Sequence, residues 1–173
     1  PKDAIAKKIG MVTEDRRTTG LMLSAMVKDN SVLPSLIYHM KSFGFADDKW
    51  IDDVSTEYKD KLHVKTPSIE TIIRNLSGGN QQKVVLAKWL ELGPDVLILN
   101  EPTRGIDVGA KAEIYAIMNN LLKQGVSIIM ISSEMPEIIN MSDRVYVMAE
   151  GRIAGCIGHE EISQEAIMKL AAV

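Results

Sequence analysis

Short apolar runs, each bounded by polar or turn-forming residues, recur along the chain and predict the strands of a sheet. Runs of this length are too short for a helix, and they are typical of strands buried on both faces of a parallel sheet. We expect three such strands, at 9–12, 96–99 and 127–131. Two further runs flank the turn at Glu150 and predict a β-hairpin, with strands at 145–148 and 153–156.

Between the strands, apolar residues return every three or four positions, which predicts amphipathic helices. Residues 47–62 show this spacing, within a stretch at about 18–75 that is expected to form a helical subdomain. Two further helices are expected, one that ends before Gly93 and one that ends at Gly125. Strand, helix and strand in succession indicate a parallel sheet with a crossover. The predicted fold is therefore α/β, with the rest of the core in residues 76–173.

Composition and charge limit the kinds of partner. With 173 residues, of which 46% are hydrophobic, the chain can bury one sizeable core. The formal net charge of −3 leaves no basic excess for a phosphate backbone, which argues against nucleic acid as a principal partner. The single cysteine, Cys156, excludes an intrachain disulfide and fits a reducing compartment. No apolar stretch approaches the roughly 20 residues that cross a bilayer, so we expect no membrane span.

The segment 76–82, LSGGNQQ, places small polar residues where a loop enters a helix. The amide groups at the start of a helix are free and lie at the positive end of the helix dipole, so they can bind a phosphate. Gly78 and Gly79 would let that phosphate approach the backbone closely. Taken alone, Ser77 and these glycines are equally well explained as an ordinary helix cap. However, the strand that follows ends in Glu101 and continues into EPTRGID, and this combination is hard to reach by chance.

With these motifs the chain resembles the ATP-binding cassette (ABC) ATPases over nearly its whole length, from Ile9 to Val173. Residues 76–82 resemble the signature motif of that family, and residues 96–101 resemble Walker B. The forms LSGGNQQK and EPTRGIDVGAK are similar to the importers for ribose, galactose and xylose, whose ATPase subunit is two cassettes fused in tandem. The segments EDRR and SSEMPE are similar to the second cassette. The resemblance implies a P-loop NTPase-like fold that binds ATP and Mg²⁺.

The resemblance also implies roles for individual residues. Glu101 stands at the position of the carboxylate that orients and polarises the attacking water. Asp107 lies in the loop that touches the partner cassette in this family, although an ordinary helix N-cap is the alternative. The signature residues are expected to contact an ATP molecule held mainly by a partner cassette; they are Ser77, Gly78, Gly79 and Gln81.

Three positions depart from the family pattern in ways that would weaken the cassette's own ATP site. Asn100 replaces the Walker B aspartate that orients the Mg²⁺ shell, and a neutral amide attracts a dication more weakly. Glu14, or else Asp15, stands in place of the glutamine that follows the first strand. Ser133 replaces the histidine that contacts the γ-phosphate.

The phosphate-binding motif G-x-x-x-x-G-K-[ST] does not occur in the sequence. In the family this motif, Walker A, lies upstream of the glutamine position, so we expect a chain that is truncated before Walker A. Such a chain is predicted to bind ATP poorly and to be inactive by itself. Missing strands would leave a sheet edge and apolar surface uncovered, which predicts self-association.

As part of a longer protein, the chain is expected to couple ATP hydrolysis to the import of a monosaccharide: galactose, methyl-galactoside or ribose. Its expected partners are the N-terminal cassette of the same subunit or a second cassette, the membrane permease subunits and, indirectly, a periplasmic sugar-binding protein. Its expected location is peripheral, at the cytoplasmic face of the cell membrane. Residues 32–38 either line a groove for a membrane subunit or belong to the subdomain core. The alternative function is a regulatory or scaffolding ABC-like domain without turnover, which Asn100 favours and Glu101 opposes.

Overall fold

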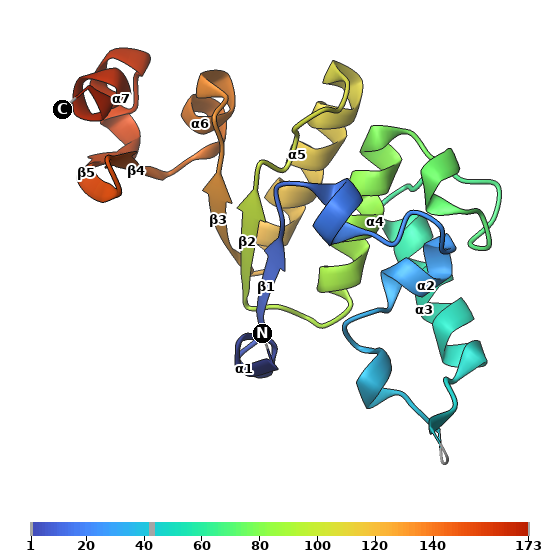
Figure 1. The fold of residues 1–173 in the computed structure, drawn as a ribbon. Helices are drawn as coiled ribbons and strands as arrows, with labels where there is room; N and C mark the ends of the chain where they lie inside the picture. Colours follow the sequence, from blue (N-terminus) through green and yellow to red (C-terminus); the bar gives the residue numbers. More distant parts are fainter. Residues whose placement is uncertain (1, 42–43, 173) are drawn as a thin grey trace. The chain divides into compact units, whose positions relative to one another are not determined.

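The chain folds into two compact units that meet in sequence after Ile131, according to a computed structural model that describes residues 2–41 and 44–172. The first unit contains a three-stranded sheet and the helices around it (Figure 1). Its elements are α1 Lys2–Ala6, β1 Ile9–Val12, η1 Arg16–Gly20, α2 Val27–Ser31, η2 Leu36–Tyr38, α3 Asp48–Lys61, η4 Ile73–Asn75, α4 Gly78–Leu90, β2 Val96–Asn100, α5 Val108–Lys123 and β3 Ser127–Ile131.

The sheet of the first unit is parallel, with the strand order β1-β2-β3. Ile9 pairs with Val96 at one end of the β1–β2 ladder, and Asn100 pairs with Ile131 at the opposite end of the β2–β3 ladder. The predicted strands and the α/β class are therefore confirmed. Because all three strands run in the same direction, their carboxyl ends meet at one edge, where α/β sheets bind ligands.

One face of this sheet is buried and the other is partly open. Leu97 and Leu99 of β2 are fully buried, and the backbone of Gly10 lies against Trp89 of α4 on that same face. On the opposite face Ile129 is 53% exposed and Ile131 49% exposed. The expectation that β2 and β3 are buried on both faces is thus wrong, because the helices described in the first unit cover only one face. Self-association through the open face remains a prediction.

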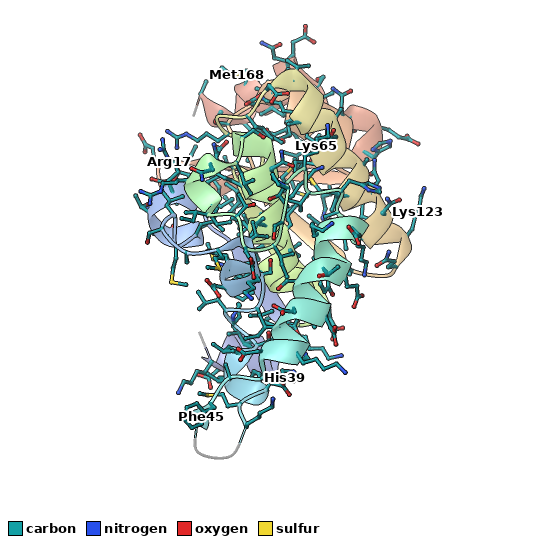
Figure 2. The ribbon with its side chains drawn as sticks, turned by 90° about the vertical axis from the view of Figure 1, so that its right-hand side faces the viewer. Arg17, His39, Phe45, Lys65, Lys123 and Met168 are labelled. Atoms are coloured by element: carbon teal, nitrogen blue, oxygen red, sulfur yellow. The ribbon has the colours of Figure 1, made fainter. Side chains whose placement is uncertain are left out.

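The helices between β1 and β2 pack on one another and on α4 (Figures 1 and 2). The hydroxyl of Tyr58 in α3 donates to the backbone oxygen of Leu90 at 2.9 Å, which links α3 to the end of α4. The predicted amphipathic helix is confirmed as α3, whereas the predicted subdomain boundaries at about 18–75 stay a prediction. Within 32–38, Val32 is buried but Ile37 and Tyr38 are each 60% exposed, so this segment is only partly core.

The second unit is a small α/β structure with its own apolar core. The predicted hairpin is confirmed, and the predicted N-cap Ser163 accepts a hydrogen bond from the Ala166 N–H at 3.2 Å. Its elements are α6 Met135–Met141, β4 Arg144–Ala149, β5 Arg152–Gly158, η5 His159–Glu161 and α7 Gln164–Ala171. The core consists of Val145, Val147, Ile157 and Ile167. Among the helices described in either unit, none is long and apolar enough to span a bilayer.

Candidate functional site

The N-terminus of α4 presents the exposed side chain of Ser77. Ser77 is the N-cap, and its Oγ accepts hydrogen bonds from the backbone N–H of Asn80 at 3.5 Å and from the Asn80 side-chain Nδ2 at 2.9 Å. The first amide groups of any α-helix have no partner within the helix. The start of α4 therefore offers a hydroxyl and helix-terminal amides at one place, as the LSGG motif predicts.

Close packing inside the chain requires the second glycine after Ser77 and leaves little room at the first. A Cβ atom on Gly79 would lie 2.5 Å from Cβ of Ala110 in α5, which is too short for real carbon atoms, so a side chain there would push α4 away from α5. A Cβ atom on Gly78 would lie 2.8 Å from Nη2 of Arg16 and 3.1 Å from the backbone oxygen of Gly105. A side chain at Gly78 would therefore displace the guanidinium of Arg16.

The carboxyl end of β2 carries Asn100 and Glu101. Asn100 is the last residue in the ladder, and the Glu101 N–H donates to the Ile131 oxygen at 2.8 Å. Glu101 has a φ of 51°, in the left-handed region that residues with a Cβ rarely occupy. This conformation costs about 1–2 kcal/mol, and such strain concentrates at functional sites. The predicted catalytic role of Glu101 stays a prediction.

Asp107 begins α5 as its N-cap. Its Oδ1 accepts a hydrogen bond from the Ala110 N–H at 2.9 Å. The capping alternative for Asp107 is therefore confirmed. The contact that it is predicted to make with a partner cassette stays a prediction, and the carboxylate is exposed, as that contact requires.

Arg16 ties together three segments that are far apart in the sequence. Its guanidinium donates from Nη1 to the Arg104 oxygen at 2.7 Å, from Nη2 to the Gly105 oxygen at 3.2 Å and from Nε to Oε1 of Gln81 at 3.4 Å. Burial, reinforced by the neighbouring charge of Arg17, lowers the pKa of Arg16. The loop after β1, the loop after β2 and α4 are thus held at one guanidinium, which we call the Arg16 clamp.

Charged side chains of both signs surround the clamp. The carboxylate of Glu14, at the predicted glutamine position, forms an ion pair with Arg104. The carboxylate of Asp15 accepts a hydrogen bond from the backbone N–H of Arg17, which is the main reason that its pKa is lowered. A hydrogen bond with the side chain of Thr18 lowers this pKa further. A hollow of about 410 Å³ lies here, lined by Glu14, Asp15, Arg16, Arg17, Arg104 and Gly105. The role of Arg16 was not predicted from the EDRR segment, because its partners lie 65 to 89 positions away in the sequence.

Gln81 is buried, and its side chain is bonded within the chain. Its Nε2 donates to the backbone oxygens of Ile73 and Leu76, each at 3.2 Å, and its Oε1 accepts from Arg16. Gln81 therefore holds the segment that leads into α4. Its predicted contact with a nucleotide stays a prediction.

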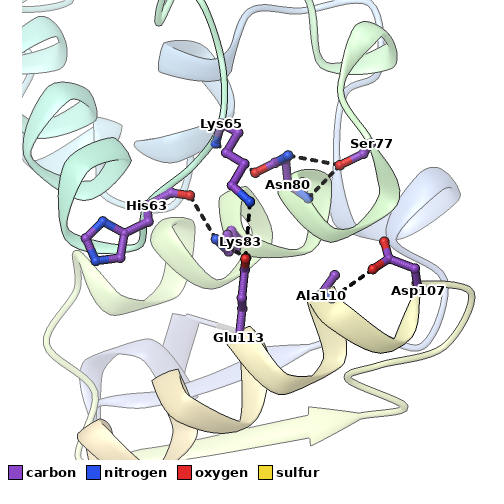
Figure 3. A network of polar contacts seen from close by, with 8 residues as sticks. All are labelled: His63, Lys65, Ser77, Asn80, Lys83, Asp107, Ala110 and Glu113. Carbon is purple, nitrogen blue, oxygen red and sulfur yellow. Dashed lines mark hydrogen bonds and ion pairs between the residues drawn. The ribbon is translucent and has the colours of Figure 1, made fainter.

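A network of charged and polar groups joins α4 to α5 and to the segment before η4 (Figure 3). Lys83 is 2% exposed; its Nζ lies 2.7 Å from Oε2 of Glu113 and donates to the His63 oxygen at 2.8 Å. Lys65 reaches Oε1 of the same Glu113 at 3.3 Å, and its backbone N–H donates to Oδ1 of Asn80 at 2.8 Å. Hydrogen bonds from Lys83 and then Lys65 lower the pKa of Glu113. None of these roles was predicted from the sequence.

The structure brings most of the predicted site segments to one edge of the sheet. Glu14 follows β1, Glu101 follows β2, and the Arg16 clamp joins their loops to the helix that Ser77 caps. Ser133 lies in the second unit, directly before α6. The first unit alone therefore holds the signature-like helix start and the end of the Walker B-like strand.

Comparison with known proteins agrees with this arrangement. The ribose import ATP-binding protein RbsA of Bacillus licheniformis is 52% identical over 99% of this chain and 34% of its own length. That of Lactococcus lactis subsp. lactis is also 52% identical, over 99% of this chain and 35% of its own length. The chain thus spans about a third of the length of these relatives.

Solved structures share the fold at low sequence identity. The crystal structure of an ATP-binding cassette of an ABC transporter, in its ADP conformation, aligns with a TM-score of 0.76 and 19% identity. The alignment covers 98% of this chain and 70% of that chain, which shows an ABC-cassette fold of the P-loop NTPase class. The family described as ABC transporter matches residues 2–104. Because this match covers more than half of the sequence and agrees with the fold, the chain belongs to the ABC transporter family of ATP-binding cassettes.

Proposed function

We propose that the chain is part of the ATP-hydrolysing subunit of a sugar importer that carries ribose or a galactoside. The observation that carries the proposal is the start of α4, where the exposed Ser77 hydroxyl stands beside helix-terminal amides. The names of the curated relatives, which describe ribose import, support the choice of a sugar. The motifs LSGGNQQK and EPTRGIDVGAK resemble those of ribose, galactose and xylose importers alike, so a galactoside is kept as the alternative sugar.

In the proposed mechanism, Ser77 and the amides of Gly78 and Gly79 bind the γ-phosphate of an ATP molecule held mainly by a partner cassette. A hydroxyl and helix-terminal amides donate hydrogen bonds, and phosphate oxygens accept them. Glu101 serves the cassette's own site, where its ionised carboxylate accepts a hydrogen bond from the attacking water and orients it. The two motifs therefore act on two different ATP molecules.

The cassette's own site is proposed to be the weaker of the two. When bound, Mg²⁺ neutralises charge on the phosphates, and it prefers oxygen ligands. Asn100 offers an amide oxygen, which fits Mg²⁺ in type but brings no negative charge. The carboxylate of Glu14 is already paired with Arg104, and Ser133 is shorter than the histidine it replaces.

The test uses the full-length protein assembled with its membrane subunits. Ser77→Arg should nearly abolish ATP hydrolysis, because the long side chain would occupy the place of the phosphate. Ser68→Arg adds the same group at another exposed serine and should leave the rate near that of the wild type. Restoring the family residues with Asn100→Asp and Ser133→His should change turnover little. Equal loss of activity from disabling the Walker A lysine of either cassette would contradict the asymmetric assignment.

Membrane subunits are the proposed partners of the segment 22–41 together with Phe45. Several apolar side chains are exposed there, and exposed apolar surface favours contact with another protein. They are Met22, Met26, Leu33, Ile37, Tyr38, Met40 and Phe45. The proposed location is accordingly the cytoplasmic face of the membrane, as a peripheral subunit beside its permease, which receives sugar from a periplasmic binding protein.

A further inference from the structure

The side chain of Asn80 lies between the signature serine and the segment before η4 (Figure 3). Its Nδ2 donates to Oγ of Ser77 at 2.9 Å, and its Oδ1 accepts the backbone N–H of Lys65 at 2.8 Å. Asn80 is therefore the link between Ser77 and a part of the chain that lies outside α4.

The contact with Lys65 fixes which end of the Asn80 amide faces Ser77. A backbone N–H can only donate, so the atom that faces it has to be the carbonyl oxygen of Asn80. The amide NH₂ then points to Ser77. Two interactions hold the segment around Lys65 in place. Lys83 donates to the His63 oxygen at 2.8 Å, and Lys65 Nζ lies 3.3 Å from Oε1 of Glu113.

This orientation determines how Ser77 can bond. A serine hydroxyl has one hydrogen to donate and two lone pairs that accept. Among the residues that the structure describes, Ser77 Oγ receives two hydrogen bonds, and both come from Asn80: one from the side chain and one from the backbone N–H at 3.5 Å. The hydroxyl hydrogen is thus kept for a group that approaches the exposed start of α4 from outside.

We propose that Asn80 is a positioning residue that sets the polarity of Ser77, so that the hydroxyl donates outward to a phosphate oxygen of the bound ATP. The inference rests on the proposed function, in which Ser77 contacts that ATP. A phosphate oxygen only accepts hydrogen bonds, so a hydroxyl turned inward would present lone pairs to it and repel it. Asn80 itself touches no reacting atom and acts through Ser77 alone.

The decisive variant is Asn80→Asp in the full-length protein assembled with its membrane subunits. One carboxylate oxygen still accepts the Lys65 N–H, but the other accepts from Ser77 and turns the hydroxyl hydrogen inward. A lost bond to a charged group corresponds to about a 10- to 100-fold effect, so kcat/KM for ATP should fall by about that factor. The variant should fold, because an acidic residue is favourable in the first turn of a helix.

A comparison with Asn80→Ala separates polarity from packing. In Asn80→Ala the hydroxyl is free to rotate and can still donate outward, so kcat/KM should fall less than in Asn80→Asp. A purely structural role predicts the reverse order, because Asp fills the volume of Asn and keeps the bond to Lys65. Asn75→Asp adds the same charge at an exposed position near Ser77, and it should leave kcat/KM close to the wild-type value.

A double-mutant cycle gives the second test. If Asn80 acts through the Ser77 hydroxyl, Asn80→Asp should cost little further activity in a Ser77→Ala background. An equal loss in both backgrounds, or a loss in Asn80→Asp no greater than in Asn80→Ala, would overturn the inference while leaving the proposed function intact. Unchanged hydrolysis and ATP affinity in Ser77→Ala alone would overturn the proposed function, and the inference with it.

Discussion

Removing the carboxylate of Glu113 should destabilise the chain more than removing the buried lysine that it contacts. Lys83 is 2% exposed, and its ammonium contacts Glu113 Oε2 at 2.7 Å and the His63 oxygen at 2.8 Å. Glu113→Ala removes the counter-charge and leaves the neutral backbone oxygen of His63 in contact with the ammonium. A buried charge without its counter-charge is strongly unfavourable.

The size of the effect follows from the exposure of the two partners. Breaking a fully buried pair costs about 3–5 kcal/mol. The side chain of Glu113 is 43% exposed, however, so water can reach the vacated space and screen the charge. We therefore expect a loss of about 1.5–3 kcal/mol, the value for a hydrogen bond to a charged group. Lys83→Met should cost only about 1 kcal/mol, because Glu113 can turn to water and only the His63 oxygen loses a buried donor.

Urea denaturation of the 173-residue chain measures these free energies of unfolding. Trp89 lies on α4, the helix that carries Lys83, so its fluorescence in a Trp50→Phe background reports on the unfolding of this helix. Lys65→Ala is the matched control: it removes the other cation from Glu113, but its side chain is 75% exposed, and the loss should stay below about 0.5 kcal/mol. If Glu113→Ala costs no more than Lys83→Met, the reasoning from burial is refuted.

Three further predictions concern other positions. Arg16→Lys removes the forked contact to the loop after β2, so the backbone amides of residues 104–107 should exchange hydrogen about tenfold faster. The control Arg17→Lys should leave this exchange rate unchanged. Equal effects of the two variants would contradict the role of the Arg16 clamp. Glu101→Gly relieves a φ of 51° and should raise the free energy of unfolding by up to about 1 kcal/mol while hydrolysis is lost; a large destabilisation would argue against strain. Burial raises the pKa of Tyr58 to about 12, so the folded chain holds this proton more tightly than the unfolded chain does. The wild type should therefore lose stability from about pH 10 upward, and Tyr58→Phe should lose less than the wild type over this range in pH-dependent urea denaturation.

The parts of the fold that depend on residues adjacent in the sequence could be predicted from the sequence. The bounds of β1 follow from a short apolar run between Lys8 and Thr13, and the start of α7 follows from the capping residue Ser163. Gly125, with a φ of 89°, ends α5 as its position predicts. The exposure of β3 could not be predicted in this way, because it depends on which elements cover the sheet and not on the residues of the strand.

The same distinction applies to the candidate site. The cap formed by Asp107 is local, and the sequence already offered it as an alternative. Arg16 bonds to oxygens 88 and 89 positions away, so no local pattern contains that contact. The role of Asn80 depends on the path of the loop at Lys65, 15 positions earlier, which only the folded chain defines. A motif can thus locate a site, whereas the residues that orient it are found from the contacts.

The order of the strands in the sheet has a consequence for how the first unit assembles. β2, α5 and β3 follow one another directly, whereas β1 reaches β2 only across the whole helical stretch between them. Closing a longer loop costs more chain entropy, and pairs that are distant in sequence form more slowly. We therefore expect β2 and β3 to pair first around α5, with β1 docking onto this nucleus afterwards. A ribosome makes β1 before β2 and β3, so of these three strands the first to be made is the last to pair.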